Sequence, residues 1–198
     1  ENQLTSLTFP NYLNTIGYGA FWMNFLTSIT IPNSVTHIGG WAFWDNNLTD
    51  VVIPNTITSL EEGVFGSNQL ANVIIPESVT RIGHYVFEWN QLTNVTIPKR
   101  VTYIGLAAFF DNQLSSIYFR GDRPVIEPTS FLENEIEKIY YCSGTIGWPG
   151  EPILGITPQL DISCDNSNED DEPIQYSIFD IDQNGSFDAL TDGLILLR

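Results

Sequence analysis

Apolar residues recur along this chain at a constant spacing, so that each unit repeats the same hydrophobic and polar order. One column of the repeat contains Leu4, Leu26, Leu48, Leu70, Leu92, Leu114 and Ile136. From this column each unit reads L-x-x-[IVL]-x-[IF]-P, which alternates and is rich in β-branched residues, as short strands are. The proline that follows in most units ends the strand, because it has no N–H to donate to a ladder.

A second extended stretch, V-T-x-I-G, and a turn, G-x-x-A-F, complete the unit. One such unit cannot bury its apolar face alone, whereas stacked copies share a continuous core. The pattern therefore predicts a right-handed β-solenoid of about seven 22-residue repeats over residues 1–154. We expect it to be mostly β, with short helical or 3-10 turns.

An asparagine column accompanies the apolar ones: Asn2, Asn24, Asn46, Asn68, Asn90, Asn112 and Asn134. An Asn side chain offers both a donor and an acceptor, so it can satisfy backbone groups that a tight corner buries. We interpret Asn24 to Asn134 as a structural ladder rather than as ligand contacts. A phenylalanine column, which includes Phe43 and Phe65, is expected to fill the opposite corner of the core.

The repeats resemble the BspA-like, Treponema-type class of leucine-rich repeats, on the stretches LTSITIPNSVTHIGGWAF (26–43) and LTNVTIPKRVTYIGLAAF (92–109). That class commonly has Cys where this chain has Asn. The unit at 119–131, FRGDRPVIEPTSF, departs from the motif, and IYYCSGTIGWPG (139–150) reads as an ending. The resemblance implies a leucine-rich-repeat fold and a surface-exposed or secreted bacterial adhesion or binding protein.

Two surfaces are candidates for a ligand. Strand residues between the buried columns are expected to face the concave side, where small hydroxyl side chains give way to Tyr118 and Tyr140. A second surface carries Trp22, Trp41, Trp44 and Trp89 beyond the phenylalanine column. Exposed aromatic patches mark interaction sites, and flat rings suit the apolar faces of sugars. The alternative is that these rings pack against each other and only cover the core.

The charge is strongly negative and uneven. The chain has 7 Lys and Arg against 24 Asp and Glu, a formal net charge of −17. Nucleic acid is not expected as a partner, because phosphate binding needs clustered basic residues. No apolar run approaches the roughly 18 residues of a membrane-spanning helix, so no membrane insertion is expected. We find no catalytic motif and predict that the chain is not an enzyme.

The tail carries a metal-binding motif. The stretch DIDQNGSFDALTDG (180–193) resembles the calcium loop of EF-hand and dockerin proteins. Calcium prefers six to eight oxygen ligands on a tight loop, which predicts calcium as the cofactor. The expected ligands are Asp180, Asp182, Asn184, Ser186, Asp188 and Asp192. Position twelve of the loop is Thr191, so either Asp192 closes the site or the site is open and weaker.

The two cysteines, Cys142 and Cys164, flank the predicted end of the solenoid. A disulfide between them would close a roughly 20-residue loop and add about 3 kcal/mol; two free thiols are the alternative. Residues 155–173 read as a cap extension and acidic linker, and 174–198 as a truncated calcium-binding segment with an apolar exit helix. The disulfide and the calcium loop suggest a secreted or cell-surface location. The chain is expected to be part of a longer polypeptide.

The sequence therefore predicts an extracellular binding or adhesion module with a structural calcium site. Its partner would be an unknown protein or glycan at a cell surface or matrix. Two alternatives stay open: a non-binding structural spacer, and a carbohydrate-binding accessory region of a larger secreted protein.

Overall fold

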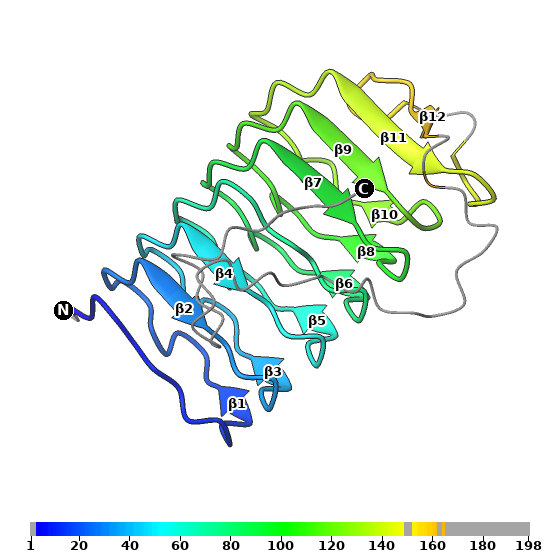
Figure 1. Cartoon of the computed structure of the whole chain (residues 1–198). Helices are drawn as coiled ribbons and strands as arrows, with labels where there is room; N and C mark the ends of the chain where they lie inside the picture. Colours follow the sequence, from blue (N-terminus) through cyan, green and yellow to red (C-terminus); the bar gives the residue numbers. More distant parts are fainter. Residues whose placement is uncertain (1–2, 149–151, 162–163, 165–198) are drawn as a thin grey trace, which may run out of the picture. The chain divides into compact units, whose positions relative to one another are not determined.

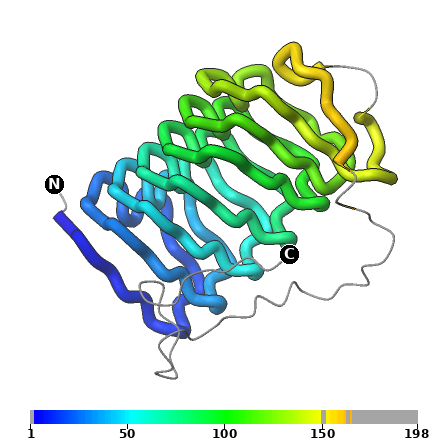
Figure 2. Tube along the Cα trace, turned by 45° about the horizontal axis from the view of Figure 1, so that its top comes forward, coloured from blue at the N-terminus to red at the C-terminus, as the bar shows by residue number. Residues whose placement is uncertain are grey.

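The computed structural model describes residues 3–148, 152–161 and 164. The chain divides into two units, Glu1–Asp165 and Asn166–Arg198, and all described residues belong to the first. This unit is a β-solenoid of about seven turns, in which each turn lies beside the next (Figure 1, Figure 2). Each turn contributes to two faces, and the predicted repeat architecture is confirmed.

The first face is formed by the longer strands, which pair in parallel (Figure 1). These strands are β2 (Ser28–Thr30), β4 (Asp50–Val52), β7 (Asn94–Ile97), β9 (Ser116–Phe119), β11 (Lys138–Cys142) and β12 (Gln159–Asp161). Up to β11, residues that lie opposite each other in paired strands are one repeat apart in the sequence, as Ser28 and Asp50 are, and Asn94 and Ser116. β12 pairs with β11 and adds a strand from the segment expected to be the cap extension.

The second face consists of two-residue strands, also paired in parallel. They are β1 (Thr15–Ile16), β3 (His37–Ile38), β5 (Ser59–Leu60), β6 (Arg81–Ile82), β8 (Tyr103–Ile104) and β10 (Val125–Ile126). In the strands from β1 to β8 the second residue points into the core and the first lies outside. The V-T-x-I-G stretch is therefore the second strand of each turn of the solenoid.

The expected short helical or 3-10 turns are wrong for the described residues, which contain no helix. The corner that carries the G-x-x-A-F motif places two residues of most repeats in the left-handed region of φ. Their φ values are 58° at Gly19 and 59° at Trp41 in one column, and 56° at Asp45 and 53° at Trp89 in the other. A left-handed residue interrupts a right-handed helix, so these corners remain hydrogen-bonded turns.

A stack of phenylalanine rings runs through the core. Phe65 is fully buried, and its ring centroid lies 5.8 Å from that of Phe43 and 5.9 Å from that of Phe87. The stack extends from Phe21 to Phe131, with one ring from each repeat. Each repeat therefore stabilises its neighbours through ring contacts in addition to strand pairing.

The asparagine column forms hydrogen bonds within and between repeats. Asn68 accepts a hydrogen bond from the Leu48 N–H at 3.0 Å. Its Nδ2 donates to the carbonyl oxygens of Phe43, Phe65 and Gly66 at 2.9, 3.1 and 3.0 Å. Asn46, Asn90 and Asn112 make the corresponding bonds. At the ends of the column, Asn134 makes the same four bonds and Asn24, in the first repeat, makes three of them.

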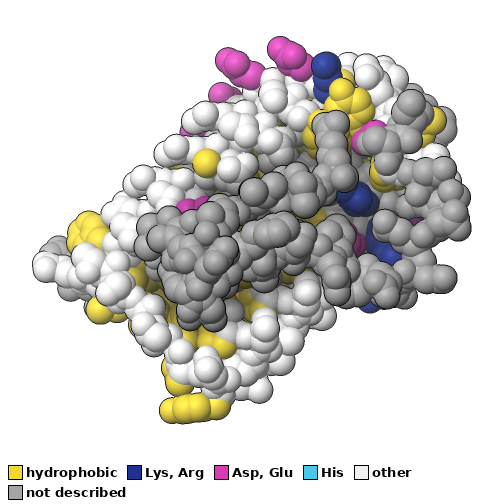
Figure 3. Space-filling view, viewed as in Figure 1, with side chains coloured by type: hydrophobic (Ala, Val, Ile, Leu, Met, Phe, Trp, Pro, Cys, Tyr) yellow, Lys and Arg dark blue, Asp and Glu magenta, His cyan; other side chains and the backbone are white. Residues whose placement is uncertain are grey.

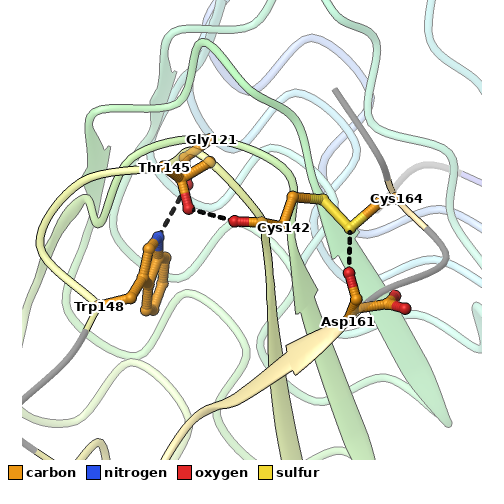
Figure 4. Close-up of a disulfide and its surroundings, with 6 residues drawn as sticks. All are labelled: Gly121, Cys142, Thr145, Trp148, Asp161 and Cys164. Atoms are coloured by element: carbon orange, nitrogen blue, oxygen red, sulfur yellow. Dashed lines mark hydrogen bonds between the residues drawn. A yellow bond between two sulfur atoms is a disulfide. The ribbon is translucent and has the colours of Figure 1, made fainter. Parts of the chain in front are cut away.

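The C-terminal end of the solenoid is closed by a buried tryptophan and a disulfide (Figure 4). Trp148 is 1% exposed, stacks on Tyr141, and donates its Nε1–H to the Gly121 carbonyl at 3.0 Å. Cys142, in β11, is joined to Cys164, which follows β12. The Cys164 sulfur also lies 3.3 Å from the Asp161 carbonyl oxygen; this is a contact rather than a hydrogen bond, because a disulfide sulfur has no proton to donate.

Loss of this disulfide is expected to lower the free energy of unfolding by about 3 kcal/mol, because the bond joins cysteines 22 residues apart and so restricts the unfolded chain. The variant Cys142→Ser/Cys164→Ser and the reduced wild-type chain should unfold at the same, lower urea concentration. An unchanged midpoint after reduction would show that the bond contributes nothing to the stability of the cap.

The visible described surface is mostly neutral. In the view of Figure 3, hydrophobic side chains are visible over both the N-terminal and the C-terminal repeats, whereas Lys and Arg side chains lie toward the C-terminal repeats. No Lys or Arg precedes Arg81 in the sequence. None of the described segments forms a helix of the length and apolarity that a membrane crossing requires.

Candidate functional site

Five aromatic side chains from three repeats form one contiguous surface, which we call the aromatic platform: Trp22, Trp41, Trp44, Tyr85 and Trp89. Trp41 is its centre, with ring centroids of Trp22, Trp44 and Tyr85 at 6.1, 4.6 and 6.1 Å. Trp89 joins through Trp44 at 5.8 Å. The rings flank the phenylalanine column on the outer side of the corner turns. Four tryptophans that are dispersed along the sequence are thereby brought together.

Three of these aromatic residues occupy left-handed backbone positions. The φ values are 59° at Trp41, 60° at Tyr85 and 53° at Trp89. Trp41 and Tyr85 belong to one column, in which two other repeats have Gly19 and Gly63. A bulky residue in this region is strained, by about 1–3 kcal/mol. Backbone hydrogen bonds to the next repeat hold the conformation, such as the Trp41 N–H to the Glu62 carbonyl at 2.7 Å. The chain therefore places large rings where glycine would be relaxed.

Glycines in the following repeat make room for these rings. An added Cβ at Gly63 would lie 2.6 Å from Cε3 of Trp41, and a Cβ at Gly66 would lie closer still to Cζ3 of Trp44. In both pairs the glycine stands one repeat after the tryptophan, in the same column. The ring thus lies against the backbone of the next turn. At Gly40 an added Cβ would instead meet the Glu62 carbonyl oxygen, at 2.9 Å, and Cδ2 of Tyr18 would lie at an ordinary contact distance of 3.7 Å.

Gly66→Ala is expected to cost about 1–3 kcal/mol of unfolding free energy, because the new methyl group would displace the Trp44 ring. The displacement should also change the tryptophan emission spectrum. Gly17→Ala is the matched control, since nothing lies within 4 Å of its Cβ position, and it should stay within about 0.5 kcal/mol of the wild type. Equal effects of the two substitutions would contradict the close contact between Trp44 and Gly66.

The platform is partly open to solvent. Trp22 is 42% and Trp89 is 49% exposed, while Trp41, Trp44 and Tyr85 are half-buried. The rings therefore pack on each other, as a cover of the core would, and still present apolar surface, as an interaction site would. Exposed contiguous aromatic surface of this kind is unusual unless it binds something.

Polar groups lie among and beside these rings. Glu88 shares the column of Trp22 and Trp44, and burial, followed by the negative charge of Asp111, raises its pKa from 4.5 to about 7. His84 precedes Tyr85, and its Nδ1 accepts the Leu106 N–H at 2.8 Å. This bond leaves Nε2 as the protonated nitrogen of the neutral ring. The platform therefore has a half-buried carboxyl group and an imidazole N–H within its margin.

The raised pKa of Glu88 predicts a pH effect on stability. The folded state favours the protonated carboxyl, whereas the unfolded chain ionises it near pH 4.5, so folding becomes less favourable as the pH rises from 4.5 to about 7. Glu88→Gln should remove this loss and be more stable than the wild type above pH 7. Urea unfolding at a series of pH values measures the free energy of unfolding of both proteins. If this free energy changed with pH in the same way in Glu88→Gln and the wild type, Glu88 could not have the raised pKa.

The first face is the other predicted ligand surface. Tyr118 and Tyr140 stack with centroids 4.9 Å apart, and both are half-buried on β9 and β11. Toward the N-terminus the same column contains Val52 and Ile74, which are 67% and 54% exposed. This face therefore has one stacked aromatic pair, and in the same column Thr96 stands between that pair and the aliphatic Val52 and Ile74.

The predicted calcium ligands, Asp180 to Asp192, and the apolar exit helix lie outside the described residues. Two cavities occur near the last repeats, of about 330 and 640 Å³. Glu133 and Asn134 line both of them, and no ring of the platform lines either. Sequence reasoning did not identify two aromatic residues: Trp148, which closes the core, and Tyr18, which lies over Gly40. The recurrence of glycine one period after Tyr18 was the available signal.

Comparison with protein families agrees with this architecture. The model of the BspA-type leucine-rich repeat region matches residues 1–93 and 41–147, in six copies. A leucine-rich repeat protein from Bacteroides ovatus ATCC 8483, known from a crystal structure, is 19% identical with a TM-score of 0.47. The match covers 74% of this chain and 54% of that protein, so the chain spans about half of its length. No curated protein matches the chain.

The family model thus covers most of the chain, and the repeat that it describes is the one visible as strands, phenylalanine stack and asparagine column. The chain belongs to the BspA-type leucine-rich repeat family.

Proposed function

We propose that this chain is an extracellular binding module that attaches to a protein or glycan through its aromatic platform. The observation that carries the proposal is the placement of Trp41 and Tyr85 in strained, left-handed positions with their rings partly exposed. Stability alone would favour glycine there, as at Gly19 and Gly63. Retained backbone strain is common at functional sites.

The proposal assigns no catalytic role to the chain. The solenoid supplies a rigid ladder that fixes the spacing of the rings, as a binding surface requires. BspA-type proteins are generally found at the cell surface or secreted, and this family membership supports an extracellular location. The disulfide between Cys142 and Cys164 is also at home in an oxidising compartment.

The proposal includes a structural calcium ion bound by the tail. It rests on the alternating oxygen ligands of Asp180, Asp182 and Asn184 and on Gly185 at the turn. Calcium would rigidify the tail segment, and the ligand would be bound by the repeats. Isothermal titration with calcium should give one site, and Asp182→Ala should abolish it.

Binding of the whole chain to an array of glycans and matrix proteins tests the proposal. The array is probed once in millimolar calcium and once in chelator. We expect specific signals in both buffers, because the platform lies in the repeats. Signals that vanish in chelator would move recognition to the tail, and silence in both buffers would favour a structural spacer instead.

A further inference from the structure

We propose that the aromatic platform binds a neutral, unbranched polysaccharide whose chain lies along the solenoid axis and contacts the rings of several repeats. This inference rests on the proposed function and narrows the ligand to one chemical class. It depends on four features of the described residues: the order of the rings along the solenoid, the scarcity of basic side chains, the polar groups at the margin, and the open faces of the outer rings.

The order of the rings along the solenoid suits an extended ligand. The rings come from three of four consecutive repeats, because the repeat between Trp44 and Tyr85 has Gly63 and Gly66 in the two columns. Trp22 and Trp44 occupy the same column in neighbouring repeats, and centroid separations within the platform run from 4.6 to 6.1 Å. A linear polymer of sugar rings could lie across this cluster and place apolar faces over its exposed rings, Trp22 at one end and Trp89 at the other.

Charge argues against the anionic members of this class. No Lys or Arg precedes Arg81, and the platform extends only to Trp89. Arg81 is the single Lys or Arg in this part of the chain, and its guanidinium lies over the Tyr103 ring, 3.9 Å from the centroid. Sulfated or carboxylated polysaccharides would meet an acidic protein with a net charge of −17. A neutral polymer avoids this repulsion.

The polar groups suit hydroxyl groups. Glu88, whose pKa is raised to about 7, is partly protonated at neutral pH and can then donate a hydrogen bond as well as accept one. The His84 ring can donate a hydrogen bond from Nε2 while Nδ1 accepts the one from the Leu106 N–H. Glu62, which follows Gly40 in its column, is exposed, and its carboxylate can accept hydrogen bonds. Such a margin of mixed donors and acceptors matches sugar hydroxyls better than it matches an aliphatic protein surface.

The open faces of the outer rings argue for a sugar polymer over a protein. Protein partners are usually anchored by side chains that fill desolvated pockets. The two cavities described above lie around Glu133 and Asn134 instead, near the last repeats. Stacking needs only an open ring face, and the exposed parts of Trp22 and Trp89 supply it.

Titration of the whole chain with neutral linear oligosaccharides of increasing length tests the inference. Gluco-, xylo-, manno- and chito-oligosaccharides, from the disaccharide upward, serve as probes, with tryptophan fluorescence and calorimetry as readouts. For the correct series, affinity should rise at least about tenfold with length and then level off once the platform is spanned. Trp41→Gly should weaken binding of the longest member by at least about tenfold.

Trp41→Gly is suitable because Gly19 and Gly63 occupy its column, so the fold tolerates the change. Tyr12→Ser is the matched control: Tyr12 is 86% exposed, Ser34 and Ser78 occupy its column, and the affinity should not change. Polygalacturonate and polylysine report on acidic and basic partners. Binding of either polymer in place of neutral sugars, or neutral-sugar binding that Trp41→Gly leaves intact, would overturn the inference. If the wild type instead binds a matrix protein and Trp41→Gly loses that binding, the inference fails but the proposed function stands. If the wild type binds none of the sugars, polymers or matrix proteins, both the inference and the proposed function fail.

Discussion

Replacing Phe65 by alanine is expected to lower the free energy of unfolding by about 3–5 kcal/mol. The Phe65 ring is fully buried in the middle of the stack, between Phe43 and Phe87. Its removal leaves a cavity that the rigid ladder on both sides cannot close. Because repeats interact mainly with their nearest neighbours, the cavity should also uncouple the repeats that precede it from those that follow it.

Urea unfolding followed by circular dichroism measures both effects of Phe65→Ala. The transition should move to lower urea and broaden or divide into two. Phe25→Ala is the matched control, since Phe25 is 52% exposed and makes no part of the stack; it should cost far less. A single, unshifted transition for Phe65→Ala would show that the phenylalanine stack does not couple the repeats.

Asn68→Ala is expected to have a comparable effect, about 3–5 kcal/mol, because several hydrogen bonds are lost at once. The Leu48 N–H would be left buried without its acceptor, at a cost of about 1–3 kcal/mol, and the donated bonds would be lost as well. The Phe43 and Phe65 carbonyls keep second partners in Asn46 and Asn90. The orphaned amide therefore dominates the loss, together with the space that the side chain leaves.

The exposed Asn72 provides the comparison, because Asn72→Ala removes the same amide from the first face. We expect it to change stability by less than about 0.5 kcal/mol. Native-state hydrogen exchange gives a second readout, in which the Leu48 amide should exchange much faster in Asn68→Ala than in the wild type. If the two variants had equal stability, the asparagine column could not be a structural ladder.

The repeat made most of the fold predictable. Its constant period determines which side chains are stacked, so the sequence alone assigns the columns of Leu26, Phe43 and Asn46 to the core. The pairing of Cys142 with Cys164 was also accessible, because they are the only two cysteines. Columns are reliable because several repeats support each assignment independently.

The corners were less predictable. Left-handed φ is usually signalled by glycine, yet Trp41, Tyr85 and Asp45 adopt it. The expectation of helical turns failed for this reason. The only hint was that glycine alternates with two of these residues in the same column, as at Gly19 and Gly63.

The aromatic platform could be anticipated only as a set of columns. Sequence grouped Trp22 with Trp44 and Trp41 with Tyr85, but the contact between the two groups depends on the backbone conformation of the corner. The fit of each ring to a glycine of the next repeat depends on interatomic distances that a sequence pattern does not contain. Trp148 was missed because it lies in the terminal segment, where the period is lost and no column applies.

The central claim is that the aromatic platform is the ligand surface, and the most direct test compares the wild type with Trp41→Gly/Trp44→Gly. Both substitutions introduce the residue found in the same columns at Gly63 and Gly66. Affinity for the strongest array ligand is measured by surface plasmon resonance, alongside the unfolding midpoint. The account predicts a loss of at least about tenfold in affinity with the solenoid still folded. Undiminished affinity in a folded double variant would contradict it and place recognition elsewhere on the chain.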